Sequence, residues 1–188
     1  MNNEIIQEAL TVLRAGGIIL YPTDTVWGLG CDATNEKAVE KIYALKQRAD
    51  SKSMIILADN LAMLERYVAK VPEMAYQLID VSDKPLTIIY PQAVGLAPNV
   101  VAADGSIAIR VVKHPFCNEL LRQFKKPIVS TSANISGENT PTNFVAVSEA
   151  IKQGVDFIVP QALEKGAAQQ SSSIIKLGLN GEIEVIRK

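Results

Sequence analysis

Residues 17–30 read Gly-Ile-Ile-Leu-Tyr-Pro-Thr-Asp-Thr-Val-Trp-Gly-Leu-Gly. The apolar start, residues 17–20, predicts a buried strand, and Pro22 ends it because proline has no backbone N–H to donate. The Thr-Asp-Thr run that follows suits a ligand-binding mouth, since open α/β sheets bind ligands beyond their strand ends. The two glycines predict a sharp turn or a close approach of the backbone to another group. A surface turn in which Asp24 caps the backbone explains the same run equally well.

Helical and strand patterns alternate along the rest of the chain. Apolar residues recur with helical spacing over residues 3–15, 34–45, 59–68, 72–80, 115–124 and 143–153. Apolar or β-branched runs predict strands at 54–58, 86–90, 106–112, 127–130, 156–159, 173–177 and 182–186, the last two joined by an Asn-Gly hairpin turn. This order predicts an α+β fold in which helices lie on the faces of a mixed β-sheet. We expect one domain over residues 1–188.

Composition narrows the class of protein. The chain has 188 residues, 48% hydrophobic and 21% charged, which is ordinary for a globular protein. A formal net charge of −1 gives no global basic field for nucleic acid or an anionic membrane. No apolar run approaches the roughly 18 residues of a membrane span. Cys31 and Cys117 lie far apart, without metal-like spacing, and His114 is the single histidine. We therefore expect a cytoplasmic protein without a metal site of its own.

Three cations, Lys46, Arg48 and Lys52, lie within seven residues after the second predicted helix. The turn-like Ala49-Asp50-Ser51 favours a helix that ends near Lys46, which would let the first two side chains converge. Such a cluster suits a polyphosphate, because Arg supplies a planar fork and Lys a point charge. The alternative is a solvated basic helix end, which the helix dipole also favours.

A second polar run, residues 130–137, reads Ser-Thr-Ser-Ala-Asn-Ile-Ser-Gly and follows another predicted buried strand. Its hydroxyls and amides can hold phosphate oxygens, a carboxylate or a ribose, but they also suit a capping and turn segment. Arg110 lies on the less apolar face of a predicted strand. A buried Arg needs an anionic partner, which is either an internal Asp or Glu or the carboxylate of a substrate.

Together these stretches resemble the YrdC-like threonylcarbamoyl-AMP synthases, in the short form without an additional C-terminal domain. The resemblance rests on residues 21–30, Lys46-x-Arg48, Pro85-Leu86-Thr87, Arg110 with His114-Pro115, and Ser132-Ala133-Asn134-x-Ser136-Gly137. It implies an open, twisted, mixed β-sheet around a concave ligand cavity. It also implies a nucleotidyltransferase that condenses L-threonine, bicarbonate and ATP to L-threonylcarbamoyladenylate and pyrophosphate. Downstream tRNA threonylcarbamoyl-transfer proteins would then modify the adenosine beside the anticodon.

The same resemblance assigns roles to individual residues. Threonine would be held by Thr23, Thr25 and Arg110. ATP would be held by Lys46, Arg48, Lys52, Thr87, Ser132, Asn134 and Ser173. Lys46 and Arg48 would also neutralise the triphosphate during the reaction, and Mg²⁺ would bridge phosphate oxygens.

Two other functions are consistent with the sequence. A non-catalytic RNA-binding module could use the same concave face, with weak RNA contact. The net charge argues against it, because phosphate-driven binding needs many Lys and Arg contacts. A carbamoyl-transfer relative that acts on another acceptor is the third interpretation. ATP turnover that requires threonine and bicarbonate separates the first interpretation from the other two.

Overall fold

The computed structural model describes residues 3–47, 54–164 and 170–188. Its strands form one mixed sheet in the spatial order β7-β1-β2-β6-β3-β5-β4-β8-β9. In chain order the strands are β1 (Ile19–Tyr21), β2 (Gly28–Gly30), β3 (Ile55–Ala58), β4 (Leu86–Tyr90), β5 (Ile107–Val111), β6 (Ile128–Ser132), β7 (Phe157–Ile158), β8 (Ser173–Leu177) and β9 (Ile183–Arg187). The pairs β1–β7, β3–β5 and β4–β8 are parallel and the others are antiparallel, which confirms the predicted mixed sheet.

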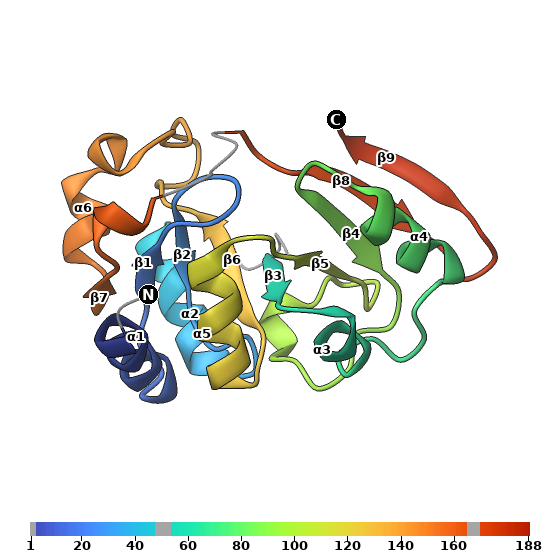
Figure 1. Cartoon of the computed structure of the whole chain (residues 1–188), viewed down its shortest axis with the longest axis horizontal. Helices are drawn as coiled ribbons and strands as arrows, with labels where there is room; N and C mark the ends of the chain where they lie inside the picture. The colour runs from blue at the N-terminus through green and yellow to red at the C-terminus, as the bar shows by residue number, and fades with distance from the viewer. Residues whose placement is uncertain (1–2, 48–53, 165–169) are drawn as a thin grey trace.

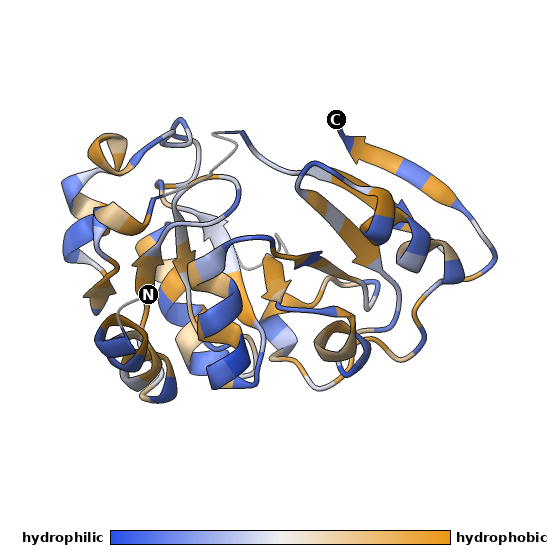
Figure 2. Cartoon of the chain, in the orientation of Figure 1, coloured by the Kyte–Doolittle hydropathy of each residue, from blue (hydrophilic) through white to orange (hydrophobic). Residues whose placement is uncertain are grey.

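The helices cover the sheet unevenly (Figure 1). They are α1 (Asn3–Arg14), α2 (Glu36–Leu45), α3 (Leu61–Glu65), α4 (Glu73–Val81), α5 (Pro115–Phe124) and α6 (Glu149–Gln153), with 3₁₀ turns at Pro98–Val100, Phe144–Ala146 and Gln161–Leu163. In Figure 1, α1, α2 and α5 gather beside the half of the sheet that contains β1, β2 and β6. Strands β4, β8 and β9 form the other half, with α4 beside them. The strands are mostly hydrophobic and the outer faces of the helices hydrophilic (Figure 2), as expected for a core between sheet and helices.

Local signals fix the ends of several helices. The side chain of Asn35 accepts a hydrogen bond from the Ala38 N–H and caps α2, as the sequence predicts. Helix α5 begins at Pro115, whose missing N–H is harmless in the first turn. It ends at Phe124, and the residue that caps it, Lys125, takes a left-handed conformation with φ of 62°. The predicted bounds of α5 and β4 agree with the structure residue for residue.

The predicted turn at Gly28 and Gly30 is wrong, because these residues form β2 in the interior of the sheet. A side chain at Gly30 would collide with a neighbouring ring: its Cβ would lie 2.6 Å from Cε1 of Tyr21 and 3.0 Å from the Val129 carbonyl oxygen. Close approach of the backbone, the other prediction for these glycines, is confirmed here. The backbone of β2 at Gly30 thus packs directly against the ring of Tyr21 in β1. Hydrophobic patterning does not reveal such a contact.

Three further elements differ from the prediction. The helix predicted over 59–68 is only the short α3, and Val68 pairs with Ala93 in an isolated β-bridge. Strand β6 continues to Ser132, beyond the predicted end, because Thr131 and Ser132 pair with β2. The helix predicted over 143–153 is divided into a 3₁₀ turn and α6, because Ser148 between them is extended, with ψ of 150°. The second difference matters most for function, because the strand extension places three consecutive hydroxyl residues on a rigid element.

Candidate active site

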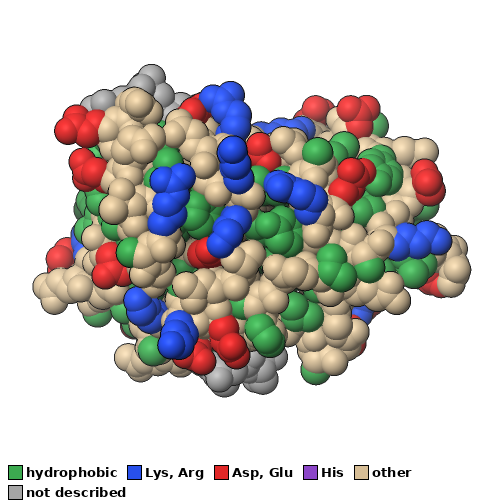
Figure 3. Space-filling view, turned by 90° about the horizontal axis from the view of Figure 1, so that it is seen from below, with side chains coloured by type: hydrophobic (Ala, Val, Ile, Leu, Met, Phe, Trp, Pro, Cys, Tyr) green, Lys and Arg blue, Asp and Glu red, His purple; other side chains and the backbone are tan. Residues whose placement is uncertain are grey.

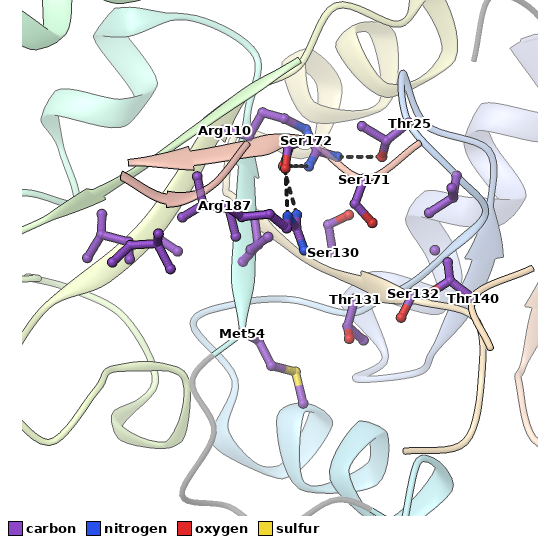
Figure 4. Close-up of a pocket in the computed structure, with 17 residues that line it drawn as sticks. Thr25, Met54, Arg110, Ser130, Thr131, Ser132, Thr140, Ser171, Ser172 and Arg187 are labelled. Atoms are coloured by element: carbon purple, nitrogen blue, oxygen red, sulfur yellow. Dashed lines mark hydrogen bonds between the residues drawn. The ribbon is translucent and has the colours of Figure 1, made fainter. Parts of the chain in front are cut away.

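A cavity of about 320 Å³ opens where the loop after β1 meets strands β3, β5, β6, β8 and β9 (Figure 4). Its polar wall consists of Thr25, Arg110, Ser130, Thr131, Ser132, Thr140, Ser171, Ser172 and Arg187. Its apolar wall includes Val26, Met54, Ile55, Ile89, Ala108, Ile174 and Ile186. The polar residues therefore suit charged or hydroxyl-bearing groups, and the apolar residues suit an apolar group.

Arg110 is the charged centre of the polar wall and is only 3% exposed. Its Nε lies 3.2 Å from Oδ1 of Asp24, which is the internal anionic partner that a buried Arg requires. Nη2 donates to the Thr25 hydroxyl at 3.3 Å, and Nη1 donates to the Ser172 hydroxyl at 3.5 Å. The two hydrogen bonds use two of the five N–H groups of the guanidinium, whereas the contact with Asp24 is an ion pair outside hydrogen-bond geometry. Among the described residues, one N–H on each of Nη1 and Nη2 makes no hydrogen bond, and two is the number that a carboxylate takes in a bidentate pair.

The Thr23 and Thr25 hydroxyls form a short chain with a fixed direction. Thr23 donates its hydroxyl proton to the carbonyl oxygen of Val26 at 2.8 Å. In the 2.9 Å contact between the two hydroxyls, Thr25 is therefore the donor. Arg110 also donates to Thr25. The Thr25 oxygen can therefore only accept a hydrogen bond from a ligand in the cavity. Thr23 lies behind Thr25 and does not line the cavity.

A second cation, Arg187 of β9, contacts Ser172, the serine to which Arg110 also donates (Figure 4). Its Nε donates to the Ser172 carbonyl at 2.9 Å and its Nη2 to the Ser172 hydroxyl at 3.4 Å. Partial burial and the nearby charge of Arg110 lower the pKa of Arg187, yet a guanidinium remains protonated at neutral pH. Two positive groups on one serine favour an anionic ligand at this end of the cavity.

Lys46, the C-terminal cap of α2, supports the chain that carries Ser132 and Asn134. Lys46 is 2% exposed, and its Nζ donates to the carbonyl oxygens of Ser132 at 2.5 Å and Asn134 at 2.6 Å. Its own carbonyl accepts the Ser136 N–H at 2.9 Å. Lys46 thus holds the chain that leaves β6, and it does not line the cavity.

The residues predicted for the site divide into three groups. Thr25, Arg110 and Ser132 line the cavity. Thr23, Lys46, Thr87, Asn134 and Ser173 lie outside its lining; Thr87 contacts the Ser172 hydroxyl at 2.7 Å, and Asn134 bonds to the carbonyls of Ile135 and Glu138. Arg48 and Lys52 lie outside the described residues.

Sequence reasoning missed Arg187, Ser171, Ser172 and Thr140. Arg187 stands next to Lys188, and two adjacent cations are typical of a solvated segment. The only local signal is the hairpin of β8 and β9, which returns Arg187 toward Ser172. Ser172, rather than the predicted Ser173, faces the cavity.

The described residues contain no group of three or more His, Cys, Asp or Glu side chains that could hold a metal ion. No helix among them is long and apolar enough to cross a membrane. The face seen from below in Figure 3 carries Lys and Arg side chains interspersed with Asp and Glu.

Residues 11–188 match the protein family described as telomere recombination, Sua5/YciO/YrdC. The chain is 37% identical to a threonylcarbamoyl-AMP synthase of Pseudoalteromonas translucida (strain TAC 125) over 181 residues, 95% of each chain. It is 41% identical to a threonylcarbamoyl-AMP synthase of Stenotrophomonas maltophilia (strain K279a) over 141 residues, 73% of this chain and 76% of that protein.

Solved structures share the fold. P. abyssi Sua5 complexed with L-threonine matches with a TM-score of 0.82 and 28% identity, over 92% of this chain and 50% of that chain. The chain thus spans about half the length of that protein. E. coli YciO matches with a TM-score of 0.81 and 23% identity, over 98% of this chain and 89% of that chain, which is a likeness of fold.

Proposed function

Since this chain is a member of the Sua5/YciO/YrdC family, we propose that it is the enzyme that makes L-threonylcarbamoyladenylate from L-threonine, bicarbonate and ATP. Its relatives of 37% and 41% identity carry the name threonylcarbamoyl-AMP synthase. The observation that carries the proposal is that Arg110 and Thr25, joined by a hydrogen bond, line a cavity whose remaining lining suits a nucleotide.

Arg110 and Thr25 form the amino-acid end of the cavity. The two available N–H groups of Arg110 take the threonine carboxylate in a bidentate pair. The Thr25 oxygen accepts a hydrogen bond from the amino nitrogen or hydroxyl of the ligand, because its own proton is given to Thr23. Thr23 thus contributes to threonine binding through Thr25.

The rest of the cavity lining takes the nucleotide. The hydroxyls of Ser130, Thr131 and Ser132 project from β6 and can donate to phosphate or ribose oxygens. Arg187 adds a positive charge for the phosphates, and the apolar wall offers a surface for the base. Lys46, Thr87 and Asn134 support this lining from behind, while Arg48 and Lys52 remain candidates for the triphosphate on sequence grounds alone. Ser173 remains a candidate for nucleotide binding on the same grounds.

The chemistry proceeds in two steps. The threonine amine attacks the carbon of bicarbonate, and water leaves to give a carbamate. A carbamate oxygen then attacks the α-phosphorus of ATP, the bond to the β-phosphate oxygen breaks, and pyrophosphate leaves. This nucleotidyl transfer depends on positioning and on neutralised charge more than on a protein nucleophile. The cavity supplies hydroxyls that can position the substrates and cations that can neutralise their charge.

Mg²⁺ would enter with ATP as part of the substrate. The described lining residues offer hydroxyls and guanidinium groups and no carboxylate, so phosphate oxygens and water would be the ligands of the ion. The product would pass to proteins that transfer the threonylcarbamoyl group to tRNA, and we propose a cytoplasmic location for the enzyme on the same grounds.

Isotope labelling tests the proposed reaction. Purified protein is incubated with MgATP, L-threonine and ¹³C-bicarbonate, and the products are analysed at once by mass spectrometry. The proposal predicts an adenylate of threonine that contains one ¹³C in its carbamoyl group. AMP or ADP without a labelled adenylate would contradict it, and salt-dependent RNA binding without any ATP consumption would favour the RNA-binding module.

A further inference from the structure

Asp24 is buried behind the amino-acid end of the cavity, with 5% of the residue exposed. Its Oδ1 lies 3.2 Å from Nε of Arg110, and its Oδ2 accepts the Lys113 backbone N–H at 3.2 Å. Arg110 belongs to β5, which ends at Val111, and Lys113 lies two residues beyond that end. The carboxylate therefore joins the loop after β1 to the strand that carries the cation.

We infer that Asp24 is a positioning residue for amino-acid binding, acting through Arg110; this rests on the proposed function. Asp24 lines a second cavity of about 260 Å³ and is absent from the lining of the first. Without it, Arg110 keeps only the hydrogen bonds to Thr25 and Ser172, at 3.3 and 3.5 Å. Both are long for N–H···O bonds and lead to hydroxyls on side chains, so they hold a buried guanidinium less firmly.

Electrostatics alone predicts the opposite sign. The negative charge of Asp24 weakens the attraction of Arg110 for an anion, so its removal would strengthen threonine binding if charge were the main effect. Positioning outweighs this effect because a bidentate pair needs both N–H groups aligned with the carboxylate. A displacement of about 1 Å in a binding site can cost up to about 100-fold.

The nucleotide side of the cavity shares Ser172 with Arg110, but none of its own hydrogen bonds involves Asp24. Arg187 is fixed on Ser172 by hydrogen bonds of 2.9 and 3.4 Å, and the serine hydroxyls project from β6. Loss of the Asp24 charge should therefore weaken threonine binding selectively. A residue that only stabilises the fold would weaken both ligands or neither.

The experiment compares Asp24→Asn with Asp32→Asn as a matched control. Asp32 is also 5% exposed and ion-paired, to Lys126 at 2.8 Å, and it accepts two hydrogen bonds from Thr34, but it does not line the cavity. Calorimetry measures the Kd for L-threonine and fluorescence the Kd for a labelled ATP analogue. We expect Asp24→Asn to raise the threonine Kd by about 10- to 100-fold and the ATP Kd by less than about threefold. Asp32→Asn should leave both within about threefold and only lower Tm.

Three outcomes overturn the inference: an unchanged threonine Kd, a lowered threonine Kd, or equal losses for both ligands in Asp24→Asn. Should that variant fail to fold, Asp24→Glu keeps the charge but moves it by one methylene, and the same selective loss is expected. A wild-type protein that binds no threonine would overturn the proposed function as well. Wild-type binding with an unaltered variant overturns the Asp24 inference alone.

Discussion

The ammonium of Lys46 lies 2.6 Å from the carbonyl oxygen of Asn134, although the two residues are 88 positions apart. A second hydrogen bond, to the Ser132 carbonyl at 2.5 Å, makes Lys46 the brace between α2 and the chain that leaves β6. The sequence predicted Lys46 as a ligand of the triphosphate. Its burial adds a structural role to that prediction, and the two roles have different consequences.

Lys46→Met should destabilise the protein strongly. It removes two charged hydrogen bonds of about 1.5–3 kcal/mol each, so we expect the free energy of unfolding to fall by about 3 kcal/mol or more. Lys41→Met is the control, because Lys41 also lies on α2 and donates to a carbonyl, that of Gly16 at 2.7 Å, but is exposed. Urea denaturation measures both variants. Equal stability of the two variants would contradict the bracing role.

Arg48→Ala should lower kcat/KM by about 10- to 150-fold while the fold survives, if Arg48 donates charged hydrogen bonds to the triphosphate. Arg48 lies outside the described residues, so this prediction rests on the sequence. Arg48→Lys should restore only part of the activity, because a point charge does not reproduce the planar fork. Wild-type turnover in Arg48→Ala would favour a solvated helix end.

Arg187→Ala should weaken the nucleotide side of the site. The variant loses a cation at the cavity and two hydrogen bonds to Ser172, and we expect kcat/KM for ATP to fall about 10- to 150-fold. The neighbouring Lys188→Ala is the matched control and should retain activity, because Lys188 does not line the cavity. Steady-state kinetics with varied ATP distinguish the two. Parallel losses in both variants would indicate a general effect of terminal charge.

The pair formed by Asp104 and Lys176 predicts a small pH-dependent stability. Lys176 donates to Asp104 at 2.8 Å and the Ser106 hydroxyl donates to the same carboxylate, which lowers the pKa of Asp104 well below its usual range. A lowered carboxyl pKa stabilises the fold above about pH 4, the value in the unfolded chain, and this contribution disappears as pH falls through the folded-state pKa.

Both side chains of that pair are substantially exposed, 54% for Asp104 and 41% for Lys176, so solvent screens the interaction. We expect Asp104→Asn to cost about 0.3–1 kcal/mol at pH 7 and progressively less as the pH falls below about 4. Thermal melting of both proteins across this range measures the difference. A difference in Tm that grows on acidification would have the wrong sign for this account.

Much of the fold follows from local patterns. The bounds of α5 and β4 follow from a proline at a helix start and from a β-branched run. Strand β2 was missed because its two glycines reflect contact with Tyr21 and β6, and such contacts exist only once the sheet has formed. Pairing between distant strands decides that packing, which no window of sequence contains.

The candidate site was predictable to a lesser degree. Thr25 and Arg110 stand out because polar groups are unusual in buried strands and at their ends. The register of β8 decides which of Ser172 and Ser173 faces the cavity. The pairing of β8 with β9 is irregular between Ile174 and Ile175, which affects that register. Arg187 becomes part of the site because the β8–β9 hairpin returns it to Ser172, which is a tertiary event.

Pyrophosphate release from ATP tests the central claim most directly. The protein is assayed with ATP and bicarbonate plus L-threonine, L-serine or L-valine, and with threonine or bicarbonate omitted. We predict release only when amino acid and bicarbonate are both present, fastest with threonine, slower with serine and far slower with valine. A site that hydrogen-bonds a substrate hydroxyl can reject an analogue without it by up to about 10⁴- to 10⁵-fold. Release that is independent of the amino acid, or equal for threonine and valine, would contradict the account.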